Sequence, residues 1–165
     1  MNLSDAMLQE LQYECAITKK LLERIPEDKL EWKPHDKSMP LGRLATHITE
    51  IPQWAGVIVD QGELDMASID FQPTVLGSRA DLLDSLQKNL DKFEEVMKGK
   101  DDQALFENWQ LKHGDKVIFD LPKVAVLRSS VLNHIVHHRG QLSVYLREND
   151  IPVPAIYGPS ADEQG

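Results

Sequence analysis

Residues 133–147, NHIVHHRGQLSVYLR, hold three of the six histidines of the chain on one predicted helix. His134 and His138 are four residues apart, so an α-helix places them on the same face, one turn apart. The same face continues through Leu127, Val131, Gln141 and Tyr145. This periodicity predicts a helix over 122–148 that directs both histidines toward a core. His137 is rotated by about 100° from His138 and is predicted to point elsewhere.

A second histidine-bearing helix is predicted over 38–60. His47 shares one face of it with Leu44, Ile48 and Ile51, and so is also expected to face the core. Ser38 is the expected N-cap. Pro52 removes one backbone donor inside the helix, so we expect a kink one turn past His47.

Two more segments have helical spacing. One covers 3–25 and is ended by Pro26, and the other runs from Ser78, in a capping-box pattern with Asp81, to Gly99. Between the third and fourth helices, the β-branched stretch ENWQLKHGDKVIFDLP surrounds a His113-Gly114-Asp115 turn and predicts a short β-hairpin. Asp120 is the expected cap of the last helix.

These elements predict an all-α fold, a four-helix bundle with a short β-hairpin between helices 3 and 4. The 165 residues fit a single domain spanning 1–165. The connection 61–77 is long, as is the one that bears the hairpin. Their length leaves open whether the helices simply alternate in direction.

The composition argues against several classes of protein. The formal net charge is −9 and the basic residues are scattered, which argues against binding of nucleic acid. No apolar run approaches the ~18 residues of a membrane span, and the start MNLSDAML lacks the features of a signal peptide. Cys15 is the single cysteine, so the chain can form no internal disulfide. We therefore expect a cytoplasmic protein without a membrane partner.

Three core-facing imidazoles, from His47, His134 and His138, need a physical explanation. A buried neutral imidazole has to satisfy both ring nitrogens, and a buried charged one has a large desolvation cost. A divalent metal ion accepts a lone pair from each ring, and three such ligands leave open coordination positions. The site suits Zn²⁺, Ni²⁺, Fe²⁺ or Mn²⁺. Spacing alone also allows the alternative of hydrogen-bonded core histidines that bind no metal.

Three longer strings carry a resemblance to a known family. They are IPEDKLEWKPHDKSMPLGRLATHITEIPQW (25–54), NHIVHHRGQLSVYLR (133–147) and VPAIYGPSADE (153–163). Together they resemble the DinB-like (damage-inducible) four-helix-bundle metal-binding family, over nearly the whole chain. The resemblance implies a three-histidine site at His47, His134 and His138, with zinc or nickel as the typical metal.

The resemblance also implies two alternatives for function. Some relatives are bacillithiol-, glutathione- or mycothiol-dependent enzymes, in which a metal activates a low-molecular-weight thiol co-substrate. The first hypothesis is therefore a metal-dependent thiol S-transferase with a small-molecule substrate. The second is a non-enzymatic, stress-related metal-binding protein. Because family members often form dimers, the resemblance also implies a homodimer.

Four other side chains are candidates for the surroundings of the metal or for a substrate pocket: Arg139, Gln141, Trp54 and Tyr145. Arg139 could bind a substrate carboxylate, or form a salt bridge with a neighbouring acid. Gln141 could hydrogen-bond a ligand histidine, or be an ordinary polar residue at the edge of the core. Trp54 could line a cleft beside the metal or only fill the core, and Tyr145 lies on the histidine face.

Overall fold

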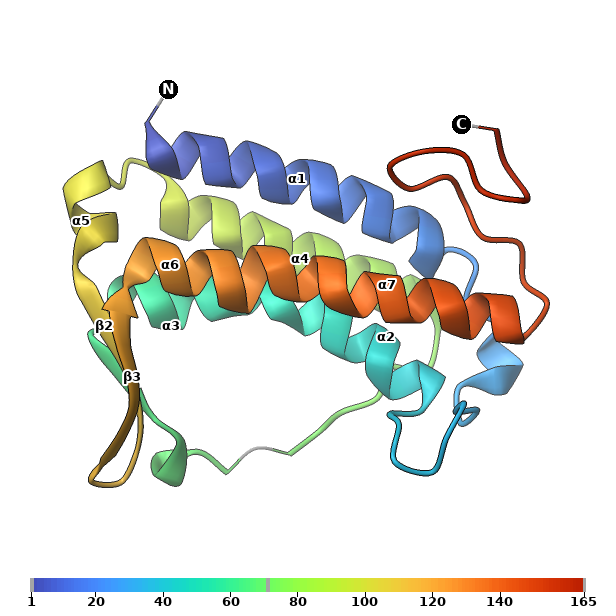
Figure 1. The fold of residues 1–165 in the computed structure, drawn as a ribbon, viewed down its shortest axis with the longest axis horizontal. Helices are drawn as coiled ribbons and strands as arrows, with labels where there is room; N and C mark the ends of the chain where they lie inside the picture. The colour runs from blue at the N-terminus through green and yellow to red at the C-terminus, as the bar shows by residue number, and fades with distance from the viewer. Residues whose placement is uncertain (1, 71, 165) are drawn as a thin grey trace.

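Four helical rods run side by side in the structure, a computed structural model that describes residues 2–70 and 72–164 (Figure 1). The first is α1 (Leu3–Leu22) and the third is α4 (Arg79–Met97). The second consists of α2 (Leu41–Glu50), a 3₁₀ turn (Ile51–Gln53) and α3 (Trp54–Asp60). The fourth consists of α6 (Lys123–Leu127), a π turn (Arg128–Leu132) and α7 (Asn133–Glu148). The predicted four-helix bundle is confirmed.

The rods do not alternate in direction. In Figure 1, α1 and the α6–α7 rod run from left to right, whereas α2–α3 and α4 both run from right to left. The connection 61–78 joins α3 to α4 and leads from the left end of the bundle back to its right end (Figure 1). Two consecutive rods can therefore run in the same direction. The α2 helix contacts both α4 and α7, and α1 also contacts both. The second rod therefore faces the histidine-bearing fourth rod directly.

The kink that Pro52 predicts in the second rod is present. The α-helical pattern stops at Glu50, passes through the 3₁₀ turn that contains Pro52, and resumes at Trp54. Proline has no backbone donor and its ring clashes with the carbonyl four residues earlier, which accounts for the change of helix type. The kink leaves His47 in α2 and Trp54 at the start of α3.

A small sheet closes the left end of the bundle in Figure 1. The predicted hairpin is formed by β2 (Asn108–His113) and β3 (Lys116–Pro122), and Gly114 has a φ of +57° in its tight turn. A third strand, β1 (Glu63–Asp65), pairs in parallel with β2. Strand β1 was not predicted, because three residues are too few to show an alternation. The short helix α5 (Asp102–Phe106) was not predicted either.

Two predicted helix caps are wrong. Ser38 lies in a turn before α2, and the first amides of that helix, from Leu41 and Gly42, donate instead to the backbone carbonyls of Trp32 and Leu30. Asp120 lies within β3, where it accepts a hydrogen bond from Gln110. The amide of Lys123 donates to the Glu107 carbonyl at the start of α6. In both cases, main-chain carbonyls from a packed neighbouring segment replace the side-chain cap.

Arg139 connects α7 to α1 on the side of the helix away from α2. Its guanidinium lies 2.6 Å from the Glu14 carboxylate and also donates to the Glu14 carbonyl and to the Tyr157 hydroxyl. The Arg139 and Glu14 side chains are only 1% and 10% exposed. Tyr157, from the irregular tail, donates to the same carboxylate. This buried network joins the first rod, the fourth rod and the tail.

Within the described ranges, no helix combines the length and the apolar character needed to cross a membrane.

We predict that Arg139→Ala lowers the free energy of unfolding by about 3–5 kcal/mol, because it leaves the Glu14 carboxylate buried without its partner. The matched control is Arg128→Ala, which breaks a partly exposed ion pair with Glu10 between the same two rods. It should cost less than about 1 kcal/mol. Urea denaturation of the metal-free proteins, followed by circular dichroism, measures both losses. Equal losses would contradict this assignment of the ion pair.

Candidate metal centre

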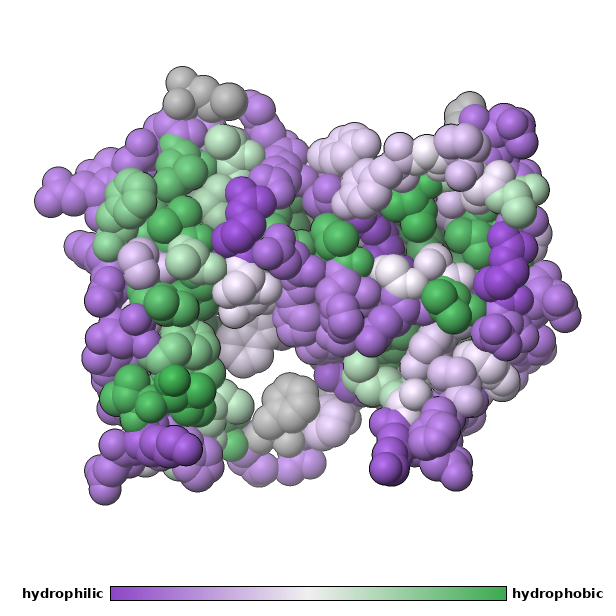
Figure 2. Space-filling model, viewed as in Figure 1, coloured by the Kyte–Doolittle hydropathy of each residue, from purple (hydrophilic) through white to green (hydrophobic). Residues whose placement is uncertain are grey.

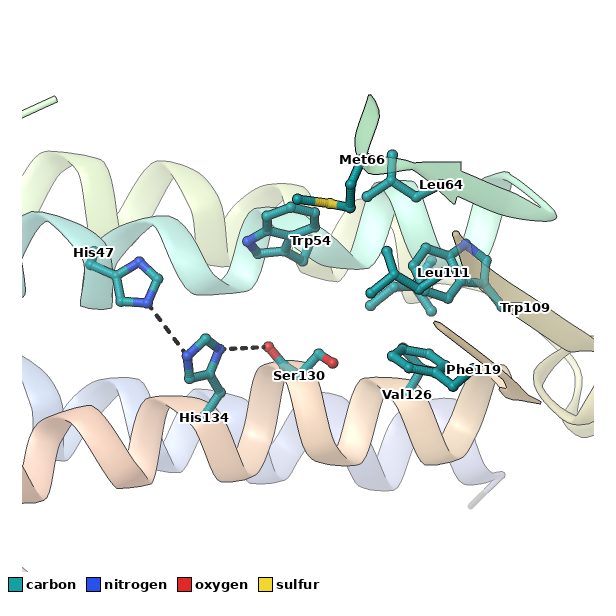
Figure 3. A pocket seen from close by; sticks show the side chains of 11 residues that line it. His47, Trp54, Leu64, Met66, Trp109, Leu111, Phe119, Val126, Ser130 and His134 are labelled. Atoms are coloured by element: carbon teal, nitrogen blue, oxygen red, sulfur yellow. Dashed lines mark hydrogen bonds between the residues drawn. The ribbon is translucent and has the colours of Figure 1, made fainter. Parts of the chain in front are cut away.

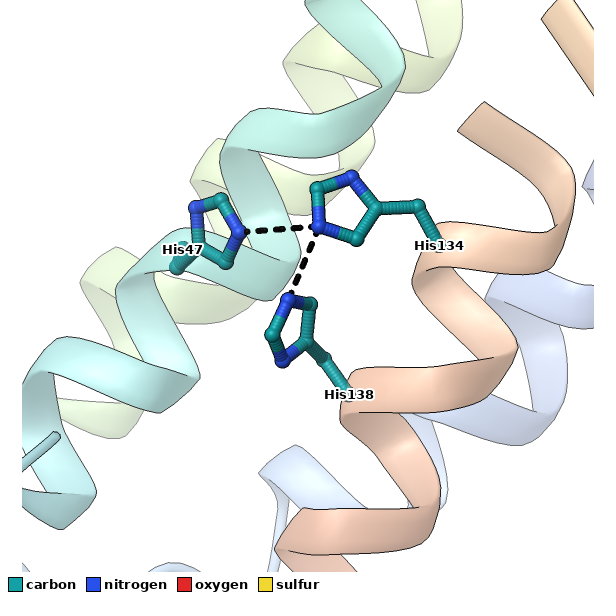
Figure 4. Close-up of side chains that lie close together, drawn as sticks. All are labelled: His47, His134 and His138. Atoms are coloured by element: carbon teal, nitrogen blue, oxygen red, sulfur yellow. Dashed lines mark hydrogen bonds between the residues drawn. The ribbon is translucent and has the colours of Figure 1, made fainter. Parts of the chain in front are cut away.

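The structure brings together the imidazoles of His47, from α2, and of His134 and His138, from α7 (Figure 4). The Nε2 atoms of His134 and His138 lie 2.8 Å apart, and the Nε2 atom of His47 lies 3.4 Å from that of His134. All three candidate ligand atoms lie within 4.8 Å of one another. Segments 87 residues apart in the sequence thus direct their nitrogens at one point.

Hydrogen bonds to the far nitrogens fix which tautomer two of the rings adopt. The Nδ1 atom of His134 lies 3.2 Å from the Ser130 carbonyl oxygen, which can only accept, so Nδ1 carries the proton. The Nδ1 atom of His138 donates in the same way to Gln141 Oε1, at 2.7 Å. Both Nε2 atoms therefore present lone pairs. In these tautomers the two lone pairs face each other at 2.8 Å, and a cation bound by both rings would remove their repulsion.

Burial makes a proton an unfavourable choice for that cation. Desolvation lowers the pKa of all three histidines below the ordinary value of 6.5. For His47 the pKa falls to about 4, because His138, His134 and Arg43 add their electrostatic effects to burial. The rings are thus neutral at pH 7. Neutral imidazole is the form that binds a metal ion.

The far side of His47 faces a fixed carboxylate. Glu50 Oε2 lies 3.9 Å from His47 Nδ1 and 2.9 Å from the Arg43 guanidinium. Its other oxygen accepts from the Thr74 hydroxyl in the connection before α4. The Glu50 side chain is only 21% exposed, so it does not lie on a solvated face of the helix. Glu50 therefore ties α2 to the 61–78 connection directly behind the His47 ring.

The π turn in the fourth rod lies directly before His134. The amide of Asn133 donates to the carbonyl of Arg128, five residues earlier, so this turn is one residue wider than an α-helical turn. Ser130, whose carbonyl orients the His134 ring, lies within it. Short π turns inside α-helices occur frequently at functional sites. The helical periodicity of the sequence does not predict this turn.

A cavity of about 230 Å³ extends from the imidazoles toward the sheet (Figure 3). Its polar end is formed by His47, His134 and Ser130. The rest of its wall is apolar or aromatic: Trp54, Ile58, Leu64, Met66, Trp109, Leu111, Phe119 and Val126. Trp54 therefore lines a space beside the histidines, as one of its two interpretations requires.

The other candidate residues lie in different places. Gln141 contacts His138 but does not line the cavity. Tyr145 donates to the Met39 carbonyl, and its ring packs edge-on against Trp32, at 5.5 Å. Arg139 is occupied by Glu14 on the α1 side and is not brought to the imidazoles. His137 is exposed, so it does not join the three-histidine cluster.

This geometry defines the class of protein: a four-helix bundle in which three imidazoles converge on one point. The sequence matches the DinB family over residues 1–164, and the chain belongs to that family.

Several known proteins are similar to the chain. The uncharacterized protein YrdA of Bacillus subtilis is 25% identical over 165 residues, covering 96% of this chain and 90% of YrdA. A DinB-like protein from Bacillus cereus has a crystal structure with a TM-score of 0.69 and 24% identity, covering 93% of this chain and 97% of that one.

YfiT from Bacillus subtilis is a more distant structural relative, with a TM-score of 0.66 and 13% identity, covering 89% of this chain and 87% of its own. It is described as a probable metal-dependent hydrolase with an unusual four-helix bundle topology. At this identity the likeness supports the fold.

The lowered pKa of His47 predicts how the metal-free protein responds to acid. Because the folded-state pKa lies below 6.5, protonation favours the unfolded chain. The neutral His47 ring should contribute fully to the free energy of unfolding above pH 6.5, and this contribution should be lost progressively as the pH falls toward about 4. Urea denaturation of wild type and His47→Gln between pH 7 and pH 4 isolates it, since carboxylates titrate in both proteins. Parallel pH profiles would contradict the prediction.

Proposed function

We propose that the chain is a divalent-metal-dependent enzyme that acts on a small molecule held in the cavity, with His47, His134 and His138 as the metal ligands. The observation that carries this proposal is the approach of the His134 and His138 Nε2 atoms to 2.8 Å, while their Nδ1 atoms face the acceptors Ser130 O and Gln141 Oε1. A cation between the two Nε2 atoms turns a repulsive contact into two coordinate bonds. Hydrogen-bonded core histidines without a metal would offer a donor to one of these lone pairs.

The donor set fits a catalytic site better than a closed structural one. Three imidazoles leave at least one coordination position open, whereas structural zinc sites use four protein ligands. Zn²⁺ and Ni²⁺ are the expected ions, and the donor chemistry also accepts Fe²⁺ or Mn²⁺. Such an ion supplies Lewis acidity and lowers the pKa of a coordinated water or thiol.

The protein's own residues orient the ligands and shape the site. The Ser130 carbonyl and Gln141 hold the rings of His134 and His138 in the tautomer that exposes Nε2. Removing such hydrogen-bond partners of ligand histidines typically lowers metal affinity or activity by about 10- to 100-fold. The apolar wall keeps water away from a substrate bound beside the ligands.

The cavity favours water over a charged thiol as the nucleophile. Among its described lining residues, none carries a charge that could hold the carboxylates of a thiol such as glutathione. Hydrolysis is therefore the first reaction class, and the description of YfiT as a probable metal-dependent hydrolase agrees with it. Thiol S-transfer, with bacillithiol, glutathione or mycothiol, is the second candidate. It rests on the family resemblance and requires the charged part of the thiol to lie outside the cavity.

A non-enzymatic metal-binding protein is the remaining alternative. It would need no space beside the open coordination position. The cavity of about 230 Å³ directly beside His47 and His134 favours an enzyme over this alternative.

Elemental analysis tests the metal ligands. Protein prepared without added nickel should retain one zinc or nickel ion per chain after dialysis, and His138→Ala should lose it because only two imidazoles remain. His137→Ala is the matched control, since it removes a neighbouring exposed histidine. A folded wild type that neither retains nor takes up a divalent metal would refute the proposal.

The two reaction classes are separated by assaying the metal-loaded protein on small neutral esters and amides, with and without each thiol. Thiol-independent turnover that disappears in His138→Ala supports hydrolysis. Turnover only with a thiol would make S-transfer the function. No turnover under any of these conditions would favour the non-enzymatic alternative.

A further inference from the structure

The small sheet forms one wall of the cavity, and its register shows how. Leu64 of β1 pairs with Leu111 of β2, which in turn pairs with Phe119 of β3. These three cross-strand neighbours all line the cavity. Trp109, two residues before Leu111, points to the same side of the sheet, and its ring lies 5.9 Å from that of Phe119. An aligned apolar row across all three strands thus faces the imidazoles (Figure 3).

The polar groups that remain available in the cavity lie toward the imidazole end. The Trp109 indole N–H is occupied by the Val57 carbonyl, at 3.2 Å. The Ser130 hydroxyl and the Trp54 indole N–H have no hydrogen-bond partner among the described residues. In Figure 3 the Trp54 nitrogen faces the side of His47, the Ser130 carbonyl oxygen lies next to the His134 ring, and the Ser130 hydroxyl lies on the side toward Val126. One uncharged donor is thus on the imidazole side of the cavity, and the second lies between the imidazoles and the apolar wall.

We infer that the cavity holds the neutral, apolar body of a substrate, with a hydrogen-bond acceptor such as a carbonyl directed at Ser130, Trp54 and the metal ligands. The reaction at the carbonyl group rests on the proposed function, whereas the binding of the apolar body does not depend on it. A charged body would lose its hydration against the apolar row without gaining a partner. The substrate is therefore an uncharged carbonyl compound, of the ester, amide or ketone type.

The volume limits the size of the body. An apolar cavity of about 150 Å³ is large enough for benzene. The cavity here, at about 230 Å³, accommodates a single aromatic ring or a branched aliphatic chain with a short polar group. Met66, at the edge of the wall, is 37% exposed, and the surface is hollowed between the sheet and the connection that follows β1 (Figure 2). A ligand of this size can therefore reach the cavity from that side.

Three hydroxamic acids with the same head group test the inference: benzohydroxamic, acetohydroxamic and 4-carboxybenzohydroxamic acid. Binding is followed by NMR through the indole N–H signals of Trp54 and Trp109, and Trp32 serves as the internal reference because it does not line the cavity. Benzohydroxamic acid should bind at least about tenfold more tightly than the other two. The preference should hold in metal-free protein, and zinc should raise all three affinities.

Different results would overturn the inference about the substrate and the proposed metal chemistry. Equal binding of the three probes, or tightest binding of the charged one, overturns the inference about the substrate. A preserved preference for the ring with no effect of zinc retains that inference and counts against the proposed metal chemistry.

Matched variants test the wall and the donor separately. Leu111→Glu should abolish the preference for the ring, whereas Ile118→Glu, at an exposed position of β3 directly before Phe119 and outside the cavity lining, should leave it unchanged. Ser130→Ala should weaken benzohydroxamic acid about three- to tenfold, the loss expected for one hydrogen bond. It should not change the binding of ethylbenzene, which has no acceptor. Ser129→Ala is its control, because the Ser129 hydroxyl donates to its own helix at Val126. Equal effects of Ser130→Ala on both ligands would overturn the assignment of the donor.

Discussion

The contact between the Nε2 atoms of His134 and His138 is the constraint on which the rest of this structure depends. Two neutral imidazoles present lone pairs to each other at 2.8 Å, with His47 directed at the same point from a second helix. Burial removes the simplest remedy, protonation, because it lowers the pKa of each ring. A divalent cation satisfies all three rings at once, and the fold keeps the rings positioned for it.

Opposite faces of the fourth rod make different contacts. One face carries the two histidines toward α2 and the cavity, while Arg139 on the other face forms a buried ion pair with Glu14 of α1. The π turn and the Ser130 carbonyl set the orientation of the first ring, and Gln141 sets that of the second. The small sheet adds the apolar wall. Rigid packing on one side of the helix thus supports an open site on the other.

The periodicity of the sequence predicted much of the fold and the histidine cluster. The i, i+4 spacing placed His134 and His138 on one face, and the chemistry of Pro52 predicted the kink beside His47. The same helical geometry would have predicted that Arg139 points away from the site, because it is rotated by about 100° from His138. The caps at Ser38 and Asp120 failed because carbonyls of packed connections took their place, which local sequence does not encode. Strand β1 and the π turn are too short to leave a periodic signal.

X-ray absorption spectroscopy of the metal-loaded protein shows whether these three imidazoles bind one metal ion. For zinc, we expect three imidazole nitrogens at about 2.0–2.1 Å, with the remaining positions filled by light atoms from solvent. His138→Ala should not retain the ion and should therefore lose this imidazole scattering. A wild-type spectrum dominated by sulfur at about 2.3 Å, or one without imidazole scattering, would contradict this coordination.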